Sequence, residues 1–187
     1  MKLYFIRHAK TTGNSEHRYI GKTDEPLCQT GIEELLKRNY PDTDIVAASP
    51  MKRCVETAKI IYPKKEIRIY SGFRECDFGD FEGKNYSDLG SNAYYQKWID
   101  SMGTLPFPNG EDHAGFVNRC CEEFLKSVSE LSEYKSIAYV VHGGTIMAVL
   151  ERFSSEKRSF YDSQVKNCGG YSCEYKHGKI FVIEEFL

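Results

Sequence analysis

Short apolar segments of strand length alternate with helical patterns along the chain. The segments span residues 3–6, 45–48 and 137–141, and each is followed by a stretch with helical character. Such alternation is typical of a parallel sheet, because right-handed crossovers place the helices on both of its faces. The pattern therefore predicts an α/β fold with a mostly parallel central sheet flanked by helices.

Further patterns extend this prediction. Apolar side chains at three- and four-residue spacing predict one helix that ends near Pro63 and a longer one over residues 116–131. Segment 74–110 is rich in Gly, Asp, Ser and Tyr, and is interpreted as a small insertion over the sheet with one aromatic-bearing helix. Residues 168–186 alternate turns with β-type runs, which predicts strands added at a sheet edge.

Length and composition limit the classes of function. The 187 residues suffice for one well-buried core, so residues 1–187 are expected to form a single domain. A formal net charge of −2 would weakly repel a polyanion, which argues against a nucleic-acid partner. No run approaches the roughly 18 apolar residues of a membrane helix, and no secretory signal follows Met1. We therefore expect a cytoplasmic protein without a membrane partner.

The cysteines indicate neither a disulfide framework nor a metal site. Their number, seven, is odd, and none lies in a C-x-x-C pair with partner histidines. The adjacent Cys120 and Cys121 lie in a helical apolar pattern, where packing as small hydrophobes is favoured over a redox role. Reduced thiols, no metal and no cofactor are expected.

Polar side chains cluster where the predicted strands end. The first strand is followed by Arg7, His8 and a loop of donors that reaches Asn14, which is typical of an anion site. The spacing of a nucleotide-binding P-loop is missing. The third strand is followed by His142 and two glycines, which allow close backbone approach to a ligand. Because ligands bind at the carboxyl ends of parallel strands, we expect these groups to converge.

The end of the second strand adds a further cation. Ser49 and Pro50 have the form of a helix N-cap followed by proline at the first helical position. Lys52 and Arg53 would then lie in the first turn, where the helix dipole disfavours a cation by about 1 kcal/mol or less. A bound phosphate would offset this cost, so Arg53 is interpreted as a phosphate ligand and Lys52 as a solvent-exposed side chain.

Four ordered blocks of sequence closely resemble the histidine phosphatase superfamily, the phosphoglycerate-mutase-like group. The first block begins at Phe5-Ile6-Arg7-His8-Ala9 and continues through Asn14, Arg18, Gly21, the run at 24–27 and Gly31. The others are the Ser49–Arg53 run with Thr57 and Ala58, the acidic run at 74–83, and Val141-His142-Gly143-Gly144.

This resemblance implies roles for individual residues. His8 would be the phosphorylated nucleophile and Glu75 the general acid and base. Spacing alone does not distinguish Glu75 from the other carboxylates of its run. The implied phosphate- and substrate-binding residues are Arg7, Asn14, Arg18, Thr23, Arg53, His142 and Gly143. A neutral imidazole is a good nucleophile, and arginines can hold the negative charge that spreads over a transferring phosphoryl group.

The chain departs from the family pattern at two places. Ala9 stands where the family usually has glycine, and alanine would cost roughly 1–2 kcal/mol if that backbone were left-handed. The stretch between Gly31 and Ser49 is short, which predicts an abbreviated second helix.

The sequence thus predicts a metal-independent phosphatase that acts on a small phosphomonoester. The compact chain, the loop from Arg18 to Asp24 and the block from Asp77 to Gly83 together resemble α-ribazole-phosphatase-like enzymes, which implies α-ribazole 5′-phosphate as a substrate. Two alternatives stay open: a mutase that returns the phosphoryl group to another hydroxyl, and a weakly catalytic domain that binds phosphorylated ligands. Tyr19, Tyr86, Tyr94, Tyr95 and Trp98 either line a pocket or form the private core of the insertion, and the private core is favoured.

Overall fold

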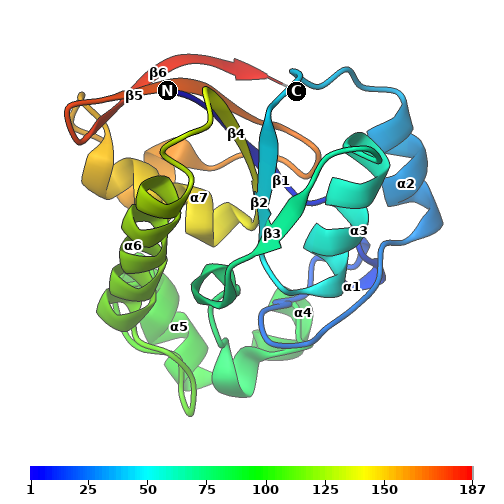
Figure 1. Ribbon diagram of the computed structural model, residues 1–187. Coiled ribbons are helices and arrows are strands. Elements are labelled where there is room, and N and C mark those ends of the chain that lie inside the picture. Colours follow the sequence, from blue (N-terminus) through cyan, green and yellow to red (C-terminus); the bar gives the residue numbers. More distant parts are fainter. Residues whose placement is uncertain (187) are drawn as a thin grey trace.

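A computed structural model describes residues 1–186 of the chain (Figure 1). Six strands form one sheet in the order β3-β2-β4-β1-β5-β6. The strands are β1 (Lys2–Arg7), β2 (Ile45–Ala48), β3 (Ile67–Ile69), β4 (Ser136–Val141), β5 (Gly170–Lys176) and β6 (Lys179–Phe186). The first four run parallel, whereas β5 pairs antiparallel with β1 and with β6. The expected mostly parallel sheet with edge strands from the end of the chain is confirmed.

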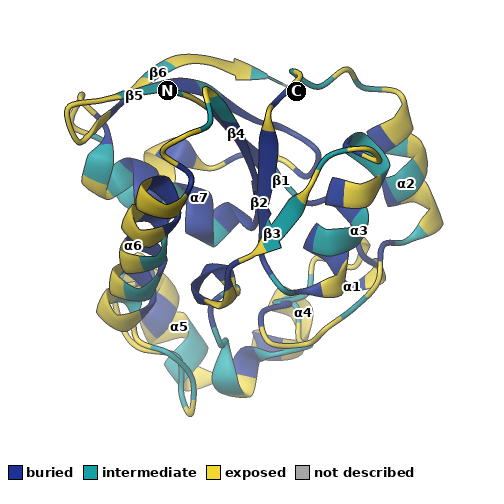
Figure 2. Cartoon of the chain, in the orientation of Figure 1, coloured by how far each residue is buried: buried dark blue, intermediate teal, exposed yellow. Residues whose placement is uncertain are grey.

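Helices cover both faces of this sheet (Figure 1). The α-helices of the described chain are α1 (Thr12–Ser15), α2 (Gln29–Leu36), α3 (Lys52–Ile61), α4 (Tyr86–Leu89), α5 (Ala93–Asp100), α6 (His113–Glu130) and α7 (Gly143–Phe153). Helices α6 and α7 lie on one face, and α3 with α2 beside it on the other. Figure 2 shows their buried sides turned toward the strands. None of the helices in the described part is both long and apolar enough to cross a bilayer.

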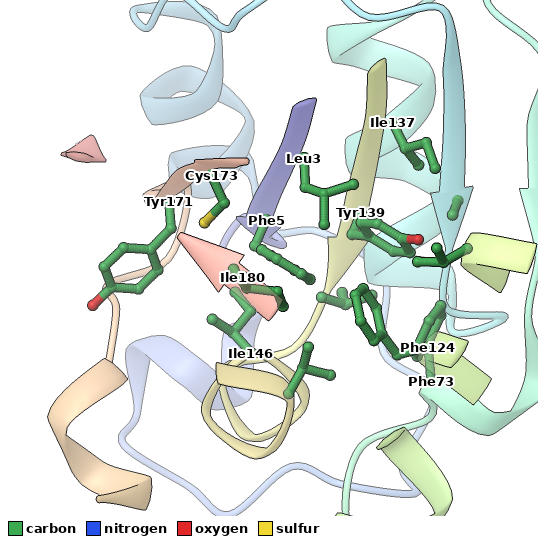
Figure 3. Packing of buried hydrophobic residues seen from close by; sticks show 14 of the residues in the cluster. Leu3, Phe5, Phe73, Phe124, Ile137, Tyr139, Ile146, Tyr171, Cys173 and Ile180 are labelled. Atoms are coloured by element: carbon green, nitrogen blue, oxygen red, sulfur yellow. The ribbon is translucent and has the colours of Figure 1, made fainter. Parts of the chain in front are cut away.

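Alternate residues of each strand feed two separate cores, as the two-residue period of a strand requires. On one face, Phe5 and Tyr139 stack at 5.1 Å between ring centroids and pack with Phe124 of α6 and Ile146 of α7 (Figure 3). On the other face, strand residues pack against α3, including its Ala58.

The insertion over residues 74–110 lies at the end of the molecule opposite the two termini (Figure 1). Since β1 begins beside the N-terminus, this is the end where the parallel strands finish. The insertion holds two helices, α4 and α5, rather than the single one expected. Phe81, Leu89 and Trp98 form its own buried core, with Tyr94 and Tyr95 packed against them.

The beginning of α3 differs from the prediction. The helix starts at Lys52 and its N-cap is Met51, whose side chain makes no capping hydrogen bond, so Ser49 is not the N-cap and Pro50 is not the first helical residue. The Ser49 hydroxyl instead accepts from the ring of His142, at the end of the neighbouring strand β4, and from the backbone N–H of Met51, which precedes the helix. The predicted end near Pro63 agrees with the last helical residue, Ile61.

Candidate active site

A cavity of about 290 Å³ lies between the strand ends and the insertion. Of the residues proposed from the sequence, its lining includes Arg7, His8, Asn14, Arg18, Glu75 and Gly143. Thr23, Arg53 and His142 are not part of this lining. The cavity is slightly smaller than most ligand pockets, which suits a small molecule.

His8 is 3 % exposed and follows the last residue of β1. Its Nδ1 lies 2.7 Å from the carbonyl oxygen of Ala9. Because a carbonyl can only accept, Nδ1 carries the proton and donates, which leaves the lone pair of Nε2 free. Burial, together with the positive charges of Arg53 and Arg7, holds the pKa of His8 well below its usual range. The imidazole is therefore neutral near pH 7.

Arg7 precedes His8, and one end of its guanidinium is bonded to the backbone. Its Nη1 donates to the carbonyl of Val165 at 2.8 Å, whereas its buried Nε has no hydrogen-bond partner within residues 1–186. A Cβ built on Gly143 would lie 3.4 Å from this Nε, so the guanidinium rests against the start of α7. An uncompensated buried donor is rare in a folded protein, and together with the place of Arg7 in the cavity lining it makes this guanidinium a candidate ligand for an anion.

The loop after His8 is fixed by two asparagines. Asn167 donates through Nδ2 to the carbonyl of His8 at 3.0 Å and to Oδ1 of Asn14 at 3.4 Å. Asn14 Oδ1 also accepts from the backbone N–H of Thr11, so its Nδ2 group is left as a donor at the cavity. Asn167 was not found from the sequence, because it lies in an irregular segment far from the motifs.

Glu75 is the carboxylate of its segment that lines the cavity. Its Oε1 accepts from the backbone N–H of Cys76 at 3.0 Å and lies 2.5 Å from where a Cβ on Gly144 would be. Only glycine leaves room for the carboxylate there, at the start of α7. Burial raises the pKa of Glu75, although the Cys76 N–H, Arg53 and Arg7 act in the opposite direction. A carboxyl with a raised pKa can hold a proton for transfer.

The other carboxylates of the segment are occupied elsewhere. Asp77 pairs with Lys22 at 3.1 Å, and Asp80 accepts from the side chain of Asn109. Glu82 Oε1 accepts from the backbone N–H groups of Gly21 and Thr23 at 2.8 and 2.9 Å. Glu82 thus fixes the loop over residues 21–23 rather than facing the cavity.

Arg53 and His142 lie behind His8, and both are completely buried. Arg53 Nε donates to His142 Nδ1 at 3.3 Å, so Nδ1 is an acceptor and Nε2 carries the proton that is donated to Ser49 Oγ at 2.8 Å. Burial and the charge of Arg53 hold the pKa of His142 well below its usual range. The rings of His8 and His142 meet edge to face, with centroids 5.2 Å apart.

Arg53 and the N-terminus of α3 are bonded to groups of the protein itself. Arg53 Nη1 and Nη2 donate to the carbonyls of Thr23 and Gly21, each at 2.8 Å. The side chain of Asp24 accepts from the backbone N–H of Lys52 at 2.7 Å. The protein itself therefore supplies the anion at the N-terminus of α3, where the sequence had suggested a phosphate. Lys52 is exposed, as expected.

Thr23 and Arg18 are farther from the chemistry than the sequence suggested. Thr23 is exposed, and its contact with the site is its carbonyl group, which accepts from Arg53. Arg18 lines the rim of the cavity, but it is paired with Glu16 at 2.6 Å and Asp88 at 2.8 Å. Its charge is already matched by these two carboxylates.

Ala9 is accommodated without backbone strain. It is not among the residues with positive φ, and its N–H donates to Thr57 Oγ1 at 3.0 Å. The cost considered for a left-handed alanine therefore does not apply. Cys120 and Cys121 are buried in the core between α6 and α7, as the packing interpretation predicts. No group of three His, Cys, Asp or Glu side chains suited to a metal ion occurs within residues 1–186.

Comparison with known proteins gives related sequences and structures along most of the chain. A broad-specificity phosphatase of Saccharomyces cerevisiae is 29% identical over 199 residues, covering 98% of this chain and 84% of the relative. The α-ribazole phosphatase of Shigella flexneri has the same fold, with a TM-score of 0.86, 24% identity and coverage of 100% and 96%. A phosphoserine phosphatase mutant of Entamoeba histolytica in complex with phosphoserine gives a TM-score of 0.83, with 25% identity and coverage of 99% and 96%.

The family itself is defined by a match over almost the whole chain. The model of the histidine phosphatase superfamily (branch 1) matches residues 3–186. The match includes the nucleophile candidate His8, the acid candidate Glu75 and the α7 N-terminus. On this evidence the chain belongs to the histidine phosphatase superfamily.

Proposed function

We propose that this chain hydrolyses small phosphomonoesters through a covalent phosphohistidine at His8. The observation that carries the proposal is the free Nε2 lone pair of a buried, neutral imidazole, next to Arg7 and Glu75 in one cavity. Neutral imidazole attacks phosphorus, whereas imidazolium has no lone pair to use. The lowered pKa of His8 supports the neutral form at physiological pH.

The proposed reaction has two steps. His8 Nε2 forms a bond to phosphorus while the bond from phosphorus to the substrate oxygen breaks, and Glu75 gives its proton to that oxygen. The ionised Glu75 then takes a proton from water, whose oxygen attacks phosphorus as the P–N bond breaks. Inorganic phosphate leaves, and both His8 and Glu75 return to their starting forms.

The phosphoryl oxygens need donors in the cavity. The guanidinium of Arg7, Asn14 Nδ2 and the N–H of Gly143 at the start of α7 are the groups best placed to supply them. Arg53 and His142, proposed as direct ligands on the resemblance, would first have to exchange their present partners. In its present position Arg53 contributes positive charge and holds the 21–23 loop, whereas the neutral His142 lies between Arg53 and Ser49.

The substrate is a small phosphorylated metabolite, with α-ribazole 5′-phosphate as one candidate. The likeness of the fold to an α-ribazole phosphatase and the size of the cavity support a compact ester. Two other functions compete: phosphoryl transfer of the phosphoglycerate-mutase type and binding of phosphorylated ligands without turnover. The presence of both His8 and Glu75 in the cavity favours hydrolysis over simple binding, since binding needs no proton donor.

The test is the release of inorganic phosphate from p-nitrophenyl phosphate in excess EDTA. We expect turnover to persist in EDTA and to disappear in His8→Ala, because the covalent step is deleted. His17→Asn is the matched control: His17 is exposed, and asparagine tolerates its left-handed backbone. Turnover that returns only when a divalent metal is added would contradict the proposal.

Two measurements separate the alternatives. Faster isomerisation than hydrolysis of 3-phosphoglycerate would establish the mutase. Tight binding of a phosphomonoester without phosphate release and without a phosphohistidine, sought by rapid quenching in base, would establish the binding domain.

A further inference from the structure

The part of the cavity away from His8 has two largely apolar walls. One comes from the insertion and the Arg18–Ile20 loop, and the other from α6, α7 and the segment around residue 160. The first wall consists of Tyr19, Phe78, Trp98, Gly103, Leu105 and Phe107. The second consists of His113, Phe116, Met147, Phe160, Tyr161 and Gln164. The aromatic residues of the insertion thus form its core and, at the same time, one wall of the cavity.

The first wall is packed internally, and it contacts the second wall at Gly103. Phe107 packs on Phe78 and Trp98, with ring centroids 5.0 and 5.1 Å apart. Gly103 has φ +74°, and a Cβ there would lie 2.3 Å from the hydroxyl of Tyr161. The insertion and the opposite wall therefore meet at Gly103, and the slot lies between them.

These walls contain no unpaired charged side chain that could bind a charge on the alcohol part of a substrate. Among the lining residues of the described chain, the cations are Arg7, beside His8, and Arg18, whose charge is matched by Glu16 and Asp88. The single carboxylate is Glu75, which the reaction uses. His113, the remaining basic side chain, packs edge-on against Phe160 at 4.7 Å. A substrate carboxylate placed between these walls would be desolvated without a partner, which is costly.

We infer that this slot selects phosphomonoesters whose alcohol part is uncharged and carries a flat apolar ring, and that it rejects carboxylated esters such as phosphoserine and 3-phosphoglycerate. The inference rests on the proposed function and names its substrate class. Offset or edge-to-face contacts with Tyr161, Trp98 and Phe107 would hold the ring. Specificity would thus differ from that of a phosphoserine phosphatase with the same fold.

Three primary alkyl phosphates test the inference: 3-phenylpropyl phosphate and propyl phosphate, whose leaving alkoxides differ little in basicity, and phosphoserine, whose less basic alkoxide would leave more readily if binding were equal. We expect kcat/KM to fall about tenfold from the first ester to the second, since one apolar contact in a pocket discriminates by about that factor. Phosphoserine should be slower still. A phosphoserine value equal to or above that of 3-phenylpropyl phosphate would overturn the inference.

Two pairs of variants locate the effect in the walls. Tyr161→Ala, at a residue 49% exposed, should lower the phenylpropyl-to-propyl ratio severalfold, whereas Tyr86→Ala, at a tyrosine 68% exposed outside the cavity, should not change it. Gln164→Arg supplies the missing cation and should raise kcat/KM for phosphoserine about tenfold, with Gln164→Met as its uncharged control. The assignment of the walls would be contradicted if Tyr161→Ala and Tyr86→Ala had the same phenylpropyl-to-propyl ratio of kcat/KM, and if Gln164→Arg and Gln164→Met had the same kcat/KM for phosphoserine.

Failure of this inference differs from failure of the proposed function. If the order of esters is reversed but all turnover still depends on His8, the reaction stands and the specificity is wrong. If none of the esters releases phosphate from the wild-type chain, the proposed function itself fails.

Discussion

Glu75 combines two properties that a proton donor needs: a position in the cavity and a pKa raised by burial. We expect Glu75→Gln to lower kcat for propyl phosphate by about 10²–10³, in the range of general acid catalysis. The alkoxide of this ester leaves poorly without a proton. Stopped assays of phosphate release over a range of substrate concentrations measure the effect.

The nitrophenolate of p-nitrophenyl phosphate leaves without help, so the same variant should lose far less activity on that ester. Glu82→Gln serves as the comparison, since Glu82 holds the 21–23 loop from outside the cavity. Equal losses of Glu75→Gln on the two esters would remove Glu75 from the role of acid.

Some residues of the site could be predicted from the sequence and others could not. The types and order of Arg7, His8 and Glu75 could be read from the motifs, and all three line one cavity. The choice of Glu75 over neighbouring carboxylates could not be derived locally, because it depends on contact with the α7 N-terminus. Asn167 gave no signal either: it donates to the carbonyl of His8 from 159 positions away.

At the scale of elements, the start of α7 positions the acid. Gly144→Ala would place a Cβ 2.5 Å from Glu75 Oε1 and 2.9 Å from the Phe116 ring, so the carboxylate must move. We expect a drop in kcat on propyl phosphate of about tenfold or more and a smaller drop on p-nitrophenyl phosphate. Alanine favours a helix over glycine by about 1 kcal/mol, which limits the loss of stability.

Gly143→Ala is the comparison variant, because its Cβ would meet nothing closer than 3.4 Å and that neighbour belongs to Arg7 rather than to Glu75. Gly143→Ala should lower kcat by a similar factor on propyl phosphate and on p-nitrophenyl phosphate. A Gly144→Ala enzyme with unaltered selectivity between the esters would show that Glu75 does not depend on this glycine.

Helices and strands could be predicted where their buried residues form an apolar run or recur at regular spacing in the sequence. Strands β1, β2 and β4 are nearly completely buried, and their apolar runs marked them in the sequence. Strand β3 is three residues long, lies at an edge and is partly exposed, so its sequence carried little apolar signal. The start of α3 was misplaced because the Ser49 hydroxyl accepts from His142 and from the N–H of Met51, which precedes the helix, and from no helical N–H group. The contact with His142 exists only in the folded sheet.

For the whole molecule, the two buried histidines predict a sensitivity to mild acid. His8 and His142 have pKa values well below the usual range in the folded state, so below about pH 6.5 the unfolded chain binds protons that the folded chain does not. The free energy of unfolding should therefore fall as pH decreases from about 6.5, by up to about 1.4 kcal/mol per pH unit for each histidine. The raised pKa of Glu75 acts in the opposite direction and offsets part of this loss.

Urea unfolding between pH 7 and pH 5 measures this slope, above the range where ordinary surface carboxylates titrate. His8→Gln should reduce the slope by about one proton, whatever its effect on absolute stability. His17→Asn, at an exposed position, is the control. The same slope in His8→Gln and in the wild-type chain would contradict a neutral, buried His8.

The position of β1 has a consequence for the timing of folding. Both neighbours of this strand come late in the sequence: β4 at Ser136–Val141 and β5 at Gly170–Lys176. Pairings between such distant segments are slow to form, because a long loop must close before any contact is gained. In a partly folded chain, His8 would thus stay hydrated, and Arg7 would lack its Val165 partner, until the segment with Val165 and Asn167 docks against the end of β1. The imidazole would acquire its buried, neutral state only at that late step of folding.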